Sequence, residues 1–318
     1  MTTRIVAADE AGLALAVAAL ERGEVIGLPT ETVYGLAADA TNDDAVRKIF
    51  MVKGRPTNHP LIMHIAETDQ LRDLASDISD ACKVLVEHAW PGPLTVVVGA
   101  KPEVSRLVTG GRDTVAVRVP AHPAARAIIA RLGHPLAAPS ANRFGHVSPT
   151  TARHVVDDLG DDVALVVDGG SCAVGVESTI VDCTLAEPEI LRPGAVTAED
   201  VARLLDTRGH AVSASVSGES RASGMLERHY APRARLVLHE DRSTVPRGAA
   251  WVIDCATDMV AAARGLYSQL RKADDEAADV IHVVLPPPRG LGYALRDRLS
   301  KAAAGRSPLG DRRFIENP

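Results

Sequence analysis

The spacing of apolar residues predicts a helix at the start of the chain. Leu13, Val17 and Leu20 recur at helical spacing behind the capping residue Asp9, and Gly23 follows where a helix end favours positive φ. The same criteria predict further helices at 42–53, 123–132, 150–159 and 198–205, and strands at 24–28, 61–65, 94–99, 114–119, 164–167 and 179–182. Because helices and strands alternate, we expect an α/β fold with a mixed sheet.

A change of composition divides the chain. Residues 210–223 are rich in Ser, Ala and Gly and have little periodicity, which is typical of a flexible linker. After this segment, apolar runs predict strands at 235–238, 250–254 and 280–285 and helices at 259–272 and 291–304. We therefore predict a first domain at 1–209, a linker at 210–234 and a smaller α/β domain at 235–318, without internal repeats or coiled-coil heptads.

The composition argues against some classes of function. A chain of 318 residues accommodates two domains, and its cores are aliphatic, since 46% of the residues are hydrophobic but only 3% are aromatic. Few aromatic residues and a net charge of −6 argue against a dedicated RNA-binding protein, which needs stacking side chains and an excess of Lys and Arg. The four cysteines form no C-x-x-C pair and no zinc spacing, so we expect reduced core thiols and no metal site.

Several standard motifs are absent from the sequence. No basic segment is followed by an apolar stretch and a cleavage site, and the apolar run at 11–20 is too short to span a membrane, so we expect a cytoplasmic protein. No G-x-G-x-x-G, H-E-x-x-H or G-x-S-x-G motif occurs. The string nearest to a phosphate-binding P-loop, 305–312, has Asp311 where the lysine should be. An ATP site in this chain must therefore be of a less common kind.

Short polar loops contain the residue types that catalysis and binding require. The loop at 28–36 follows a predicted strand, where α/β sheets place ligands, although its Thr and Glu residues also fit the capping box of a short helix. The next loop has Lys53 and Arg55, which either match phosphate oxygens or form a solvated pair that complements the helix dipole. His64 ends a predicted strand, where it is either a hydrogen-bonded core residue or a site residue.

The remaining clusters add cations, hydroxyls and an amide. Arg118 interrupts a β-branched strand and needs an anionic partner, either a structural carboxylate such as Asp113 or Asp182 or the carboxylate of a substrate. Other polar candidates are Ser140, Asn142, Ser148, Ser178 and Arg192. These clusters contain no nucleophile with a base beside it. Such an arrangement favours a reaction that depends on positioning and charge neutralisation, such as attack of a small oxyanion on a phosphoryl group.

Taken in order, these clusters resemble one family. The matching motifs run from Val25 to Gly194 and are P-T-E-T-V-Y-G-L, K-G-R-P, P-L-I-M-H-I, W-P-G-P-L-T, D-T-V-A-V-R-V-P, A-P-S-A-N, S-P-T, G-V-E-S-T-I and L-R-P-G. They are similar to the threonylcarbamoyl-AMP synthases with a YrdC-like catalytic domain, in the long two-domain form, whose linker and C-terminal domain resemble residues 224–232 and 290–303. The resemblance implies a YrdC-like twisted mixed sheet with helices and a smaller, Rossmann-like C-terminal α/β domain.

The resemblance also implies site residues. It places the L-threonine pocket on Thr32, His64, Arg118 and Ser178, with Arg118 meeting the amino-acid carboxylate. It places the ATP site on Lys53, Arg55, His59, Thr114, Ala138, Ser140, Asn142, Ser148, Arg192 and Tyr230. Lys53 and Arg55 would offset phosphate charge during catalysis, and Tyr230, in the linker that crosses the active site, would close over the nucleotide. Many relatives have Asn at the position of His59, so either His59 or the preceding Asn58 is expected to contact ATP.

The activity implied by the resemblance is synthesis of threonylcarbamoyl-AMP, an intermediate in the modification of an adenosine in tRNA. The amine of threonine captures bicarbonate or CO₂, and the new carboxylate attacks the α-phosphate of ATP and expels pyrophosphate. The sequence has no dedicated carboxylate cage for Mg²⁺, so the ion is expected to arrive with ATP. The product is expected to pass to a tRNA threonylcarbamoyl transferase complex, without strong direct binding of tRNA. Two alternatives stay open: an RNA-binding module of the same fold, and carbamoyl transfer to another acceptor.

Overall fold

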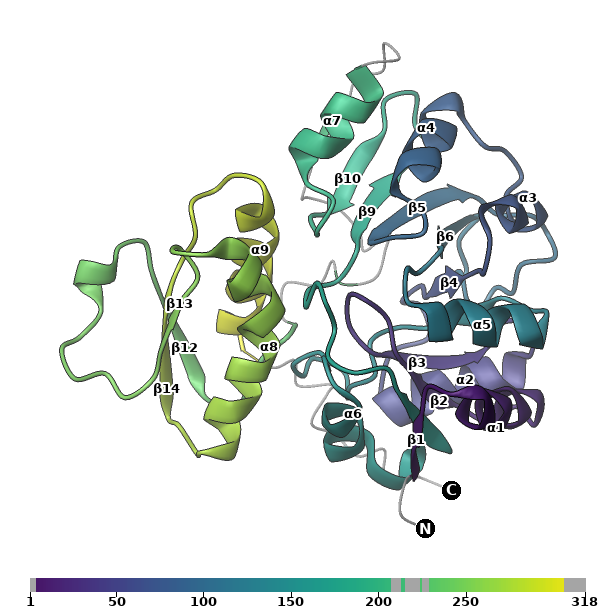
Figure 1. The fold of residues 1–318 in the computed structure, drawn as a ribbon. Coiled ribbons are helices and arrows are strands. Elements are labelled where there is room, and N and C mark those ends of the chain that lie inside the picture. Colours follow the sequence, from purple (N-terminus) through teal and green to yellow (C-terminus); the bar gives the residue numbers. More distant parts are fainter. Residues whose placement is uncertain (1–3, 207–212, 215–223, 225–228, 306–318) are drawn as a thin grey trace.

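The computed structural model of the chain describes residues 4–206, 213–214, 224 and 229–305, with only the backbone described at 213–214. The larger unit contains the strands β1 (Arg4–Ala7), β2 (Ile26–Leu28), β3 (Gly35–Asp39), β4 (Ile62–His64), β5 (Leu94–Gly99), β6 (Thr114–Arg118), β7 (Leu136–Ala137), β8 (Leu165–Asp168), β9 (Thr179–Asp182), β10 (Glu189–Arg192) and β11 (Ser213–Ala214). Within the described ranges they form one sheet in the order β1-β8-β2-β3-β7-β4-β6-β5-β9-β10-β11 (Figure 1). Because it contains both parallel and antiparallel pairs, the expected mixed sheet is confirmed.

Helices cover this sheet on its two faces. They are α1 (Glu10–Glu21), α2 (Asp43–Lys53), α3 (Leu71–Leu74), α4 (Asp80–Ala89), α5 (Pro123–Leu132), α6 (Ala152–Leu159) and α7 (Ala198–Asp206), with short 3-10 turns at 68–70 and 160–162. Helices α1 and α5 pack against each other over one apolar cluster, whereas α2, α4, α6 and α7 contribute to a larger cluster. Among the described helices, none combines the length and the apolar character that a bilayer crossing requires.

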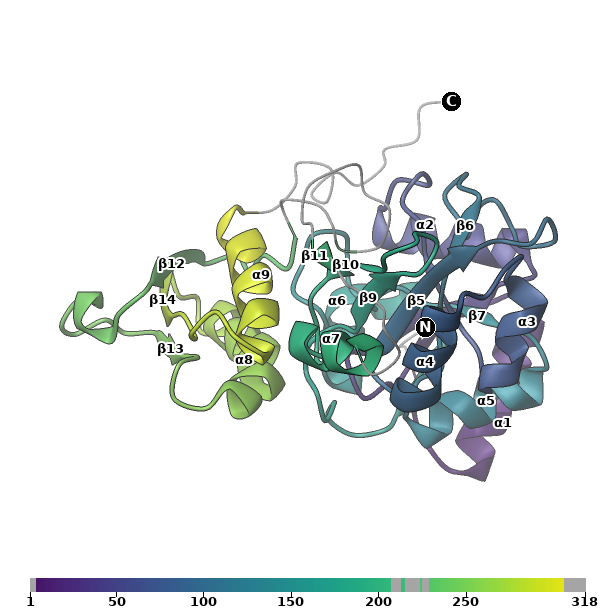
Figure 2. The same ribbon diagram turned by 90° about the horizontal axis from the view of Figure 1, so that it is seen from above.

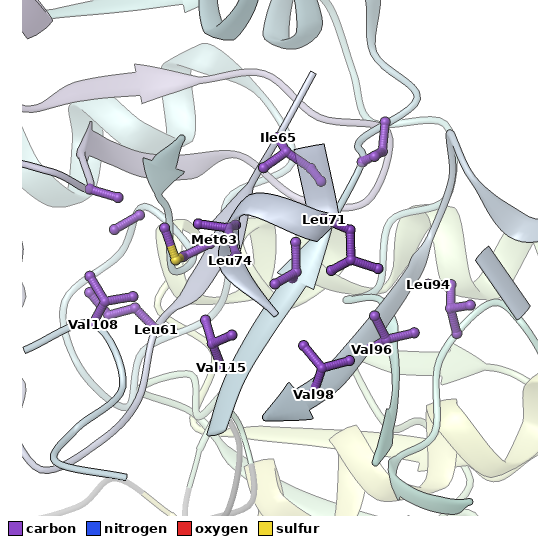
Figure 3. Close-up of a cluster of buried hydrophobic side chains, with 14 of the residues drawn as sticks. Leu61, Met63, Ile65, Leu71, Leu74, Leu94, Val96, Val98, Val108 and Val115 are labelled. Carbon is purple, nitrogen blue, oxygen red and sulfur yellow. The ribbon is translucent and has the colours of Figure 1, made fainter. Parts of the chain in front are cut away.

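The central strands present alternate residues to these two faces. Met63, Val96 and Val115 point into the larger cluster, together with the side chains of α3 and neighbouring loops (Figure 3). Their neighbours in the chain face the other way, and there Ile62 and Ala116 form a separate small apolar cluster with Val97, Ile180 and Leu191. His64 and Arg118, each two residues further along its strand, therefore lie on this second face. The period of two along each strand thus separates the core from the face that carries the candidate polar residues.

The smaller unit is the C-terminal α/β domain. Its strands β12 (Arg235–His239), β13 (Val252–Asp254) and β14 (Val280–Val284) form a parallel sheet in the order β12-β14-β13, and a 3-10 turn lies at 242–244. Helices α8 (Met259–Asp275) and α9 (Leu291–Ala303) lie between this sheet and the larger unit in both views (Figures 1 and 2). The expected two-part architecture, with a smaller Rossmann-like α/β domain, is confirmed.

Local sequence signals account for most elements. Asp9 caps α1 by accepting a hydrogen bond from the Gly12 amide at 2.9 Å, and Gly54 ends α2 with a φ of 62°.

The patterns did not predict β1, β3, β7, β10, β11, α3 or α4. The alternative of a short helix opening in the loop at 28–36 is wrong, because this loop is the turn between the antiparallel strands β2 and β3. The predicted domain boundaries at 209 and 210 fall outside the described residues, as does most of the linker, so the boundaries stay predictions.

Candidate functional site

A cavity that is partly open to solvent lies where several strands of the large sheet end. Eight residues predicted from the sequence line it: Thr32, His64, Ala138, Ser140, Arg118, Ser178, Arg192 and Tyr230. The other six, Lys53, Arg55, His59, Thr114, Asn142 and Ser148, are not among the described residues that line it. The structure therefore brings together at the cavity all four residues predicted for threonine and four of the ten predicted for ATP. The other six predicted ATP residues do not belong to its described lining.

The turn between β2 and β3 forms one side of the cavity. The Thr30 hydroxyl donates a hydrogen bond to the Val33 carbonyl at 2.6 Å and accepts one from the Thr32 amide at 3.2 Å. The Thr30 and Thr32 hydroxyls lie 2.9 Å apart, and because the proton of Thr30 is used on Val33, Thr32 donates to Thr30. The lone pairs of Thr32 remain available, and one accepts a hydrogen bond from Arg118 Nη1 at 2.8 Å. The loop sequence thus fixes the hydroxyl that meets the arginine.

Arg118 ends β6 and is buried against the cavity. Its Nε donates to the Gly92 carbonyl at 3.0 Å, and its Nη2 forms an ion pair with Glu31 Oε1 at 2.6 Å. The structural partners considered for Arg118, Asp113 and Asp182, are therefore wrong, and Glu31, which the sequence analysis did not single out, takes that place. Burial raises the pKa of the Glu31 carboxyl, but the charge and hydrogen bond of Arg118 outweigh this effect and hold the pKa below its ordinary value. Glu31 is ionised at neutral pH.

His64 lies beside Arg118 because the two residues are register partners on the parallel strands β4 and β6. Burial, and then the charge of Arg118, lower the pKa of His64 to about 3, so the imidazole is neutral at pH 7. Its Nδ1 is 3.3 Å from the Ile62 carbonyl, which can only accept a hydrogen bond. The proton therefore lies on Nδ1, and Nε2 is an acceptor. Both alternatives considered for His64 apply, since it is a buried, hydrogen-bonded residue that also lines the cavity.

Ser178 and Arg192 form the opposite side of the cavity. Arg192, at the end of β10, donates through Nε and Nη2 to the Ser178 carbonyl at 3.0 and 2.9 Å and through Nη2 to the Ser178 hydroxyl at 3.0 Å. The same hydroxyl is 2.7 Å from the hydroxyl of Thr95 on β5. A residue predicted for threonine and a residue predicted for ATP are therefore in direct contact, so two ligands bound there would be neighbours.

Lys53 and Arg55 lie behind the cavity wall. Lys53 Nζ donates to the backbone carbonyls of Ser140 and Asn142 at 2.5 and 2.6 Å, and Arg55 donates to the Pro60 carbonyl at 2.9 Å. Both side chains are buried, so the alternative of a solvated pair at the helix end is wrong. Burial, followed by the charge of Arg55, holds the pKa of Lys53 well below its ordinary value, and burial lowers the pKa of Arg55 to about 10. Lys53 fastens the loop that carries Ser140 to the end of α2.

Two further predicted residues hold other parts of the wall. Asn142 is fully buried, donates to the carbonyls of Arg143 and His146, and leaves its side-chain oxygen without a hydrogen-bond partner. Ser148 donates its hydroxyl proton to Glu177 Oε1 at 2.6 Å, so only its lone pairs are available to a ligand.

The last two predicted residues, His59 and Thr114, are also absent from the described lining of the cavity. His59 packs edge-on against Phe144, and burial, aided by Arg55, lowers its pKa to about 4, whereas Asn58 is exposed. Thr114 begins the strand that Arg118 ends. Their side chains share one face of the sheet, and four residues of strand separate them by roughly 13 Å. That separation suits two ends of an extended ligand, not one small group.

Four polar residues at the site were not predicted as site residues: Thr30, Glu31, Glu177 and His229. Thr30, Glu31 and Glu177 stand within the motifs quoted for the family, but a threonine or glutamate beside hydroxyl residues gives no local signal of its role. His229 precedes Tyr230 in the linker. Among the described residues, no group of three His, Cys, Asp or Glu side chains is placed to hold a metal ion.

Comparisons with known proteins agree across both units. Residues 18–194 match the Sua5, YciO and YrdC family, which is described as telomere recombination, and residues 196–304 match the C-terminal domain of threonylcarbamoyl-AMP synthase. A threonylcarbamoyl-AMP synthase from Bacillus subtilis is 40% identical over 92% of this chain and 93% of that protein. Another, from Pyrococcus abyssi, is 38% identical over 94% of this chain and 96% of that protein. The crystal structure of P. abyssi Sua5 complexed with L-threonine is similar with a TM-score of 0.89, at 37% identity, and covers 95% of this chain and 98% of that one.

Proposed function

The chain belongs to the threonylcarbamoyl-AMP synthase family, and we propose that it joins L-threonine, bicarbonate and ATP into threonylcarbamoyl-AMP, with release of pyrophosphate and water. It is then an ATP-using nucleotidyltransferase, whose product serves the N6-threonylcarbamoyladenosine modification of tRNA. The observation that carries the proposal is the cavity itself, where Arg118, a neutral His64 and the hydroxyl of Thr32 stand opposite Ser178 and Arg192. These groups suit an amino acid on one side and a polyanion on the other.

The amino acid would bind at the ends of β4 and β6. Arg118 has Nε on Gly92, Nη1 on Thr32 and Nη2 on Glu31, which leaves N–H groups of both terminal nitrogens for a substrate carboxylate. His64 Nε2, an acceptor, would take a hydrogen bond from the amino group or hydroxyl of threonine. The free amine is the form that attacks carbon, and His64 would hold this amine as a hydrogen-bond acceptor without taking up its proton, because the pKa of His64 is about 3.

Two bonds form in the proposed reaction. Bicarbonate gives CO₂ and hydroxide, and the threonine nitrogen attacks the carbon of CO₂. The nitrogen loses a proton, which combines with the hydroxide to form water and leaves N-carboxy-threonine. One oxygen of that carboxylate then attacks the α-phosphorus of ATP, and the bond to the β-phosphate oxygen breaks, so pyrophosphate leaves with the electron pair. Arg192 on the cavity wall, with Lys53 and Arg55 behind it, would offset the phosphate charge. Because Lys53 contacts two carbonyls, its contribution to this step is electrostatic and positional.

Mg²⁺ is proposed to enter on the phosphates of ATP. The described residues offer no three-ligand carboxylate or histidine cluster, and Mg²⁺ commonly binds through substrate phosphates and water. No step above depends on an ion held by the protein. We further propose that the product passes to a tRNA threonylcarbamoyl transferase complex in the cytoplasm, and that the chain itself binds tRNA weakly, since its net charge is −6.

The test is pyrophosphate release from ATP and Mg²⁺, with and without L-threonine and bicarbonate, with the products followed by mass. We expect release only when both co-substrates are present, together with the mass of threonylcarbamoyl-AMP. Folded protein that gave no threonine-dependent turnover, but bound RNA tightly with a strong salt dependence, would support the RNA-binding alternative instead.

A further inference from the structure

Glu177 connects the cavity wall to the C-terminal domain. Its carboxylate lines the cavity, is buried, and accepts three hydrogen bonds: from Ser148 Oγ at 2.6 Å, Tyr267 Oη at 2.8 Å and Arg298 Nε at 2.7 Å. Tyr267 belongs to α8 and Arg298 to α9. A buried carboxylate is stable only when charge and hydrogen bonds compensate its lost hydration, and here the C-terminal domain supplies most of that compensation.

Arg298 holds more than Glu177. Its side chain is fully buried, its Nη2 donates to the Pro193 carbonyl at 3.0 Å, and its Nη1 pairs with Asp297 on the same helix. Its guanidinium carbon also lies 5.3 Å from the centre of the Tyr230 ring. One side chain of α9 therefore contacts two points of the catalytic domain and the aromatic residue of the linker that lines the cavity.

Tyr230 needs such support because its backbone is strained. Its φ of 62° lies in the left-handed region, which a bulky residue seldom adopts unless its surroundings impose it. The surroundings are Arg298 on one side and the ring of Tyr267, whose centre lies 5.9 Å away at an interplanar angle of 24°. One turn further along α9, Lys301 Nζ donates to the carbonyl of Gly224, another residue of the cavity wall, at 2.7 Å. Two cavity-lining residues outside the catalytic domain are thus held by the same helix.

We propose that Arg298, acting through Glu177 and Tyr230, is a positioning residue for the ATP side of the cavity. The inference rests on the proposed function and deepens it. The buried pair fastens the C-terminal domain to the wall formed by Glu177 and Pro193 and fixes Tyr230 against that wall. The C-terminal domain then contributes to catalysis by shaping the nucleotide end of the cavity, while the threonine end is formed by the catalytic domain alone.

The first experiment compares Arg298→Met with Arg296→Met in steady-state kinetics. Arg296 lies on the same helix, but its partner is the largely exposed Glu240 of the same domain, so it is a matched control. Because Arg298→Met removes the buried ion-pair partner of Glu177, which keeps only its hydrogen bonds from Ser148 and Tyr267, we expect KM for ATP to rise at least about tenfold. KM for threonine should change less than about twofold, and Arg296→Met should change neither value.

The second experiment does not depend on turnover. Hydrogen–deuterium exchange of the unliganded protein reports on the Ala231 amide, which donates to the Gly145 carbonyl at 2.9 Å next to Tyr230. Arg298→Met should speed exchange in the peptide that contains Tyr230 and Ala231, and Arg296→Met should not. If Arg298→Met does not fold, Arg298→Lys, which keeps the charge and loses the planar fork, should show both effects more weakly.

The outcomes separate the two proposals. An inactive wild-type protein would reject the proposed reaction, and the exchange data would still decide whether Arg298 positions Tyr230. Unchanged exchange near Tyr230 together with an unchanged KM for ATP in a folded Arg298 variant would overturn the positioning role. An equal rise of both KM values would also overturn it, because the residue would then support the whole fold and not the nucleotide end.

Discussion

Arg118 and Lys53 are both almost fully buried cations, yet they face different kinds of partner. Arg118 contacts a carboxylate and a hydroxyl at the edge of the cavity, and it retains N–H groups for a ligand. Lys53 directs its ammonium group at two backbone carbonyls of the loop that carries Ser140. The resemblance assigned both residues to substrate binding. The contacts show that Arg118 is placed to bind a ligand, whereas Lys53 holds the loop that forms part of the cavity wall. Burial alone therefore does not identify a ligand-binding cation, whereas the chemistry of its partners does.

Replacing Arg118 should have the largest effect. Arg118→Ala leaves both Glu31 and the substrate carboxylate without a counter-charge, so we expect kcat/KM for threonine to fall about a thousandfold. The KM for ATP should stay close to the wild-type value, because Arg118 lies at the amino-acid end. Arg106→Ala removes an exposed arginine whose partner is Asp113 and is the control in the same assay. Full activity of Arg118→Ala at low threonine concentration would show that the carboxylate binds elsewhere.

Replacing Lys53 should act mainly on stability. Lys53→Met leaves the buried carbonyl of Asn142 without the Lys53 donor and leaves that of Ser140 with the Asn142 amide, so we expect the free energy of unfolding to fall by about 2 kcal/mol in urea denaturation. Lys48→Met, on the same helix, removes a donor to the single carbonyl of Gly23 and should lower the free energy by about 1 kcal/mol. If Lys53→Met kept its stability and lost only ATP use, the ammonium group would bind phosphate directly, and the contrast with Arg118 would disappear.

The comparison also shows how far the sequence could predict this protein. Apolar periodicity and capping residues located the helices that have both, such as α1 behind Asp9 and α2 between Asn42 and Gly54. Strand β3 was missed because Gly35 to Asp39 contains no β-branched residue and becomes a strand only through pairing with β2 and β7. Long-range pairing has no signature within a short window of sequence.

The candidate site was predictable as a set but not in its internal contacts. Motif resemblance named His64 and Arg118, and the parallel register of β4 and β6 makes them neighbours. The carboxylate facing Arg118 could not be chosen from the sequence, because Glu31, Asp113 and Asp182 are equally charged and only the fold brings one of them within 2.6 Å. The family assignment and the α/β class are confirmed, while the role of each site residue stays a prediction.

A smaller effect is expected at Glu31, which neutralises Arg118 before a substrate arrives. Glu31→Gln keeps the shape of the side chain but removes the negative charge that repels a second carboxylate. We therefore expect the KM for threonine to fall about fivefold, with the KM for ATP unchanged, in the pyrophosphate-release assay. A rise in the KM for threonine would mean that Glu31 mainly holds Arg118 in its binding orientation. Glu67→Gln, which removes the exposed partner of Arg126, is the control.

The smallest effect is the pH dependence that His64 adds to stability. The pKa of His64 falls from an ordinary 6.5 in the unfolded chain to about 3 in the folded protein. Between these two pH values the unfolded chain therefore binds a proton on His64 and the folded protein does not. The contribution of the neutral His64 to the free energy of unfolding is fully present above pH 6.5, and it is lost as the pH falls from 6.5 towards 3. Between pH 7 and pH 6 it should lower the free energy of unfolding by about 0.7 kcal/mol.

His64→Gln should remove that part of the pH slope in urea denaturation, while the same substitution at the exposed His88 serves as the control. An unchanged slope in His64→Gln would mean that the folded protein can protonate this ring beside Arg118. His64 would then be able to act as a cation toward the substrate carboxylate, and the amino-acid end would hold two positive charges. Retention of the slope would thus show that the amino-acid end is not limited to the charge of Arg118, whereas the neutral imidazole implies that it is.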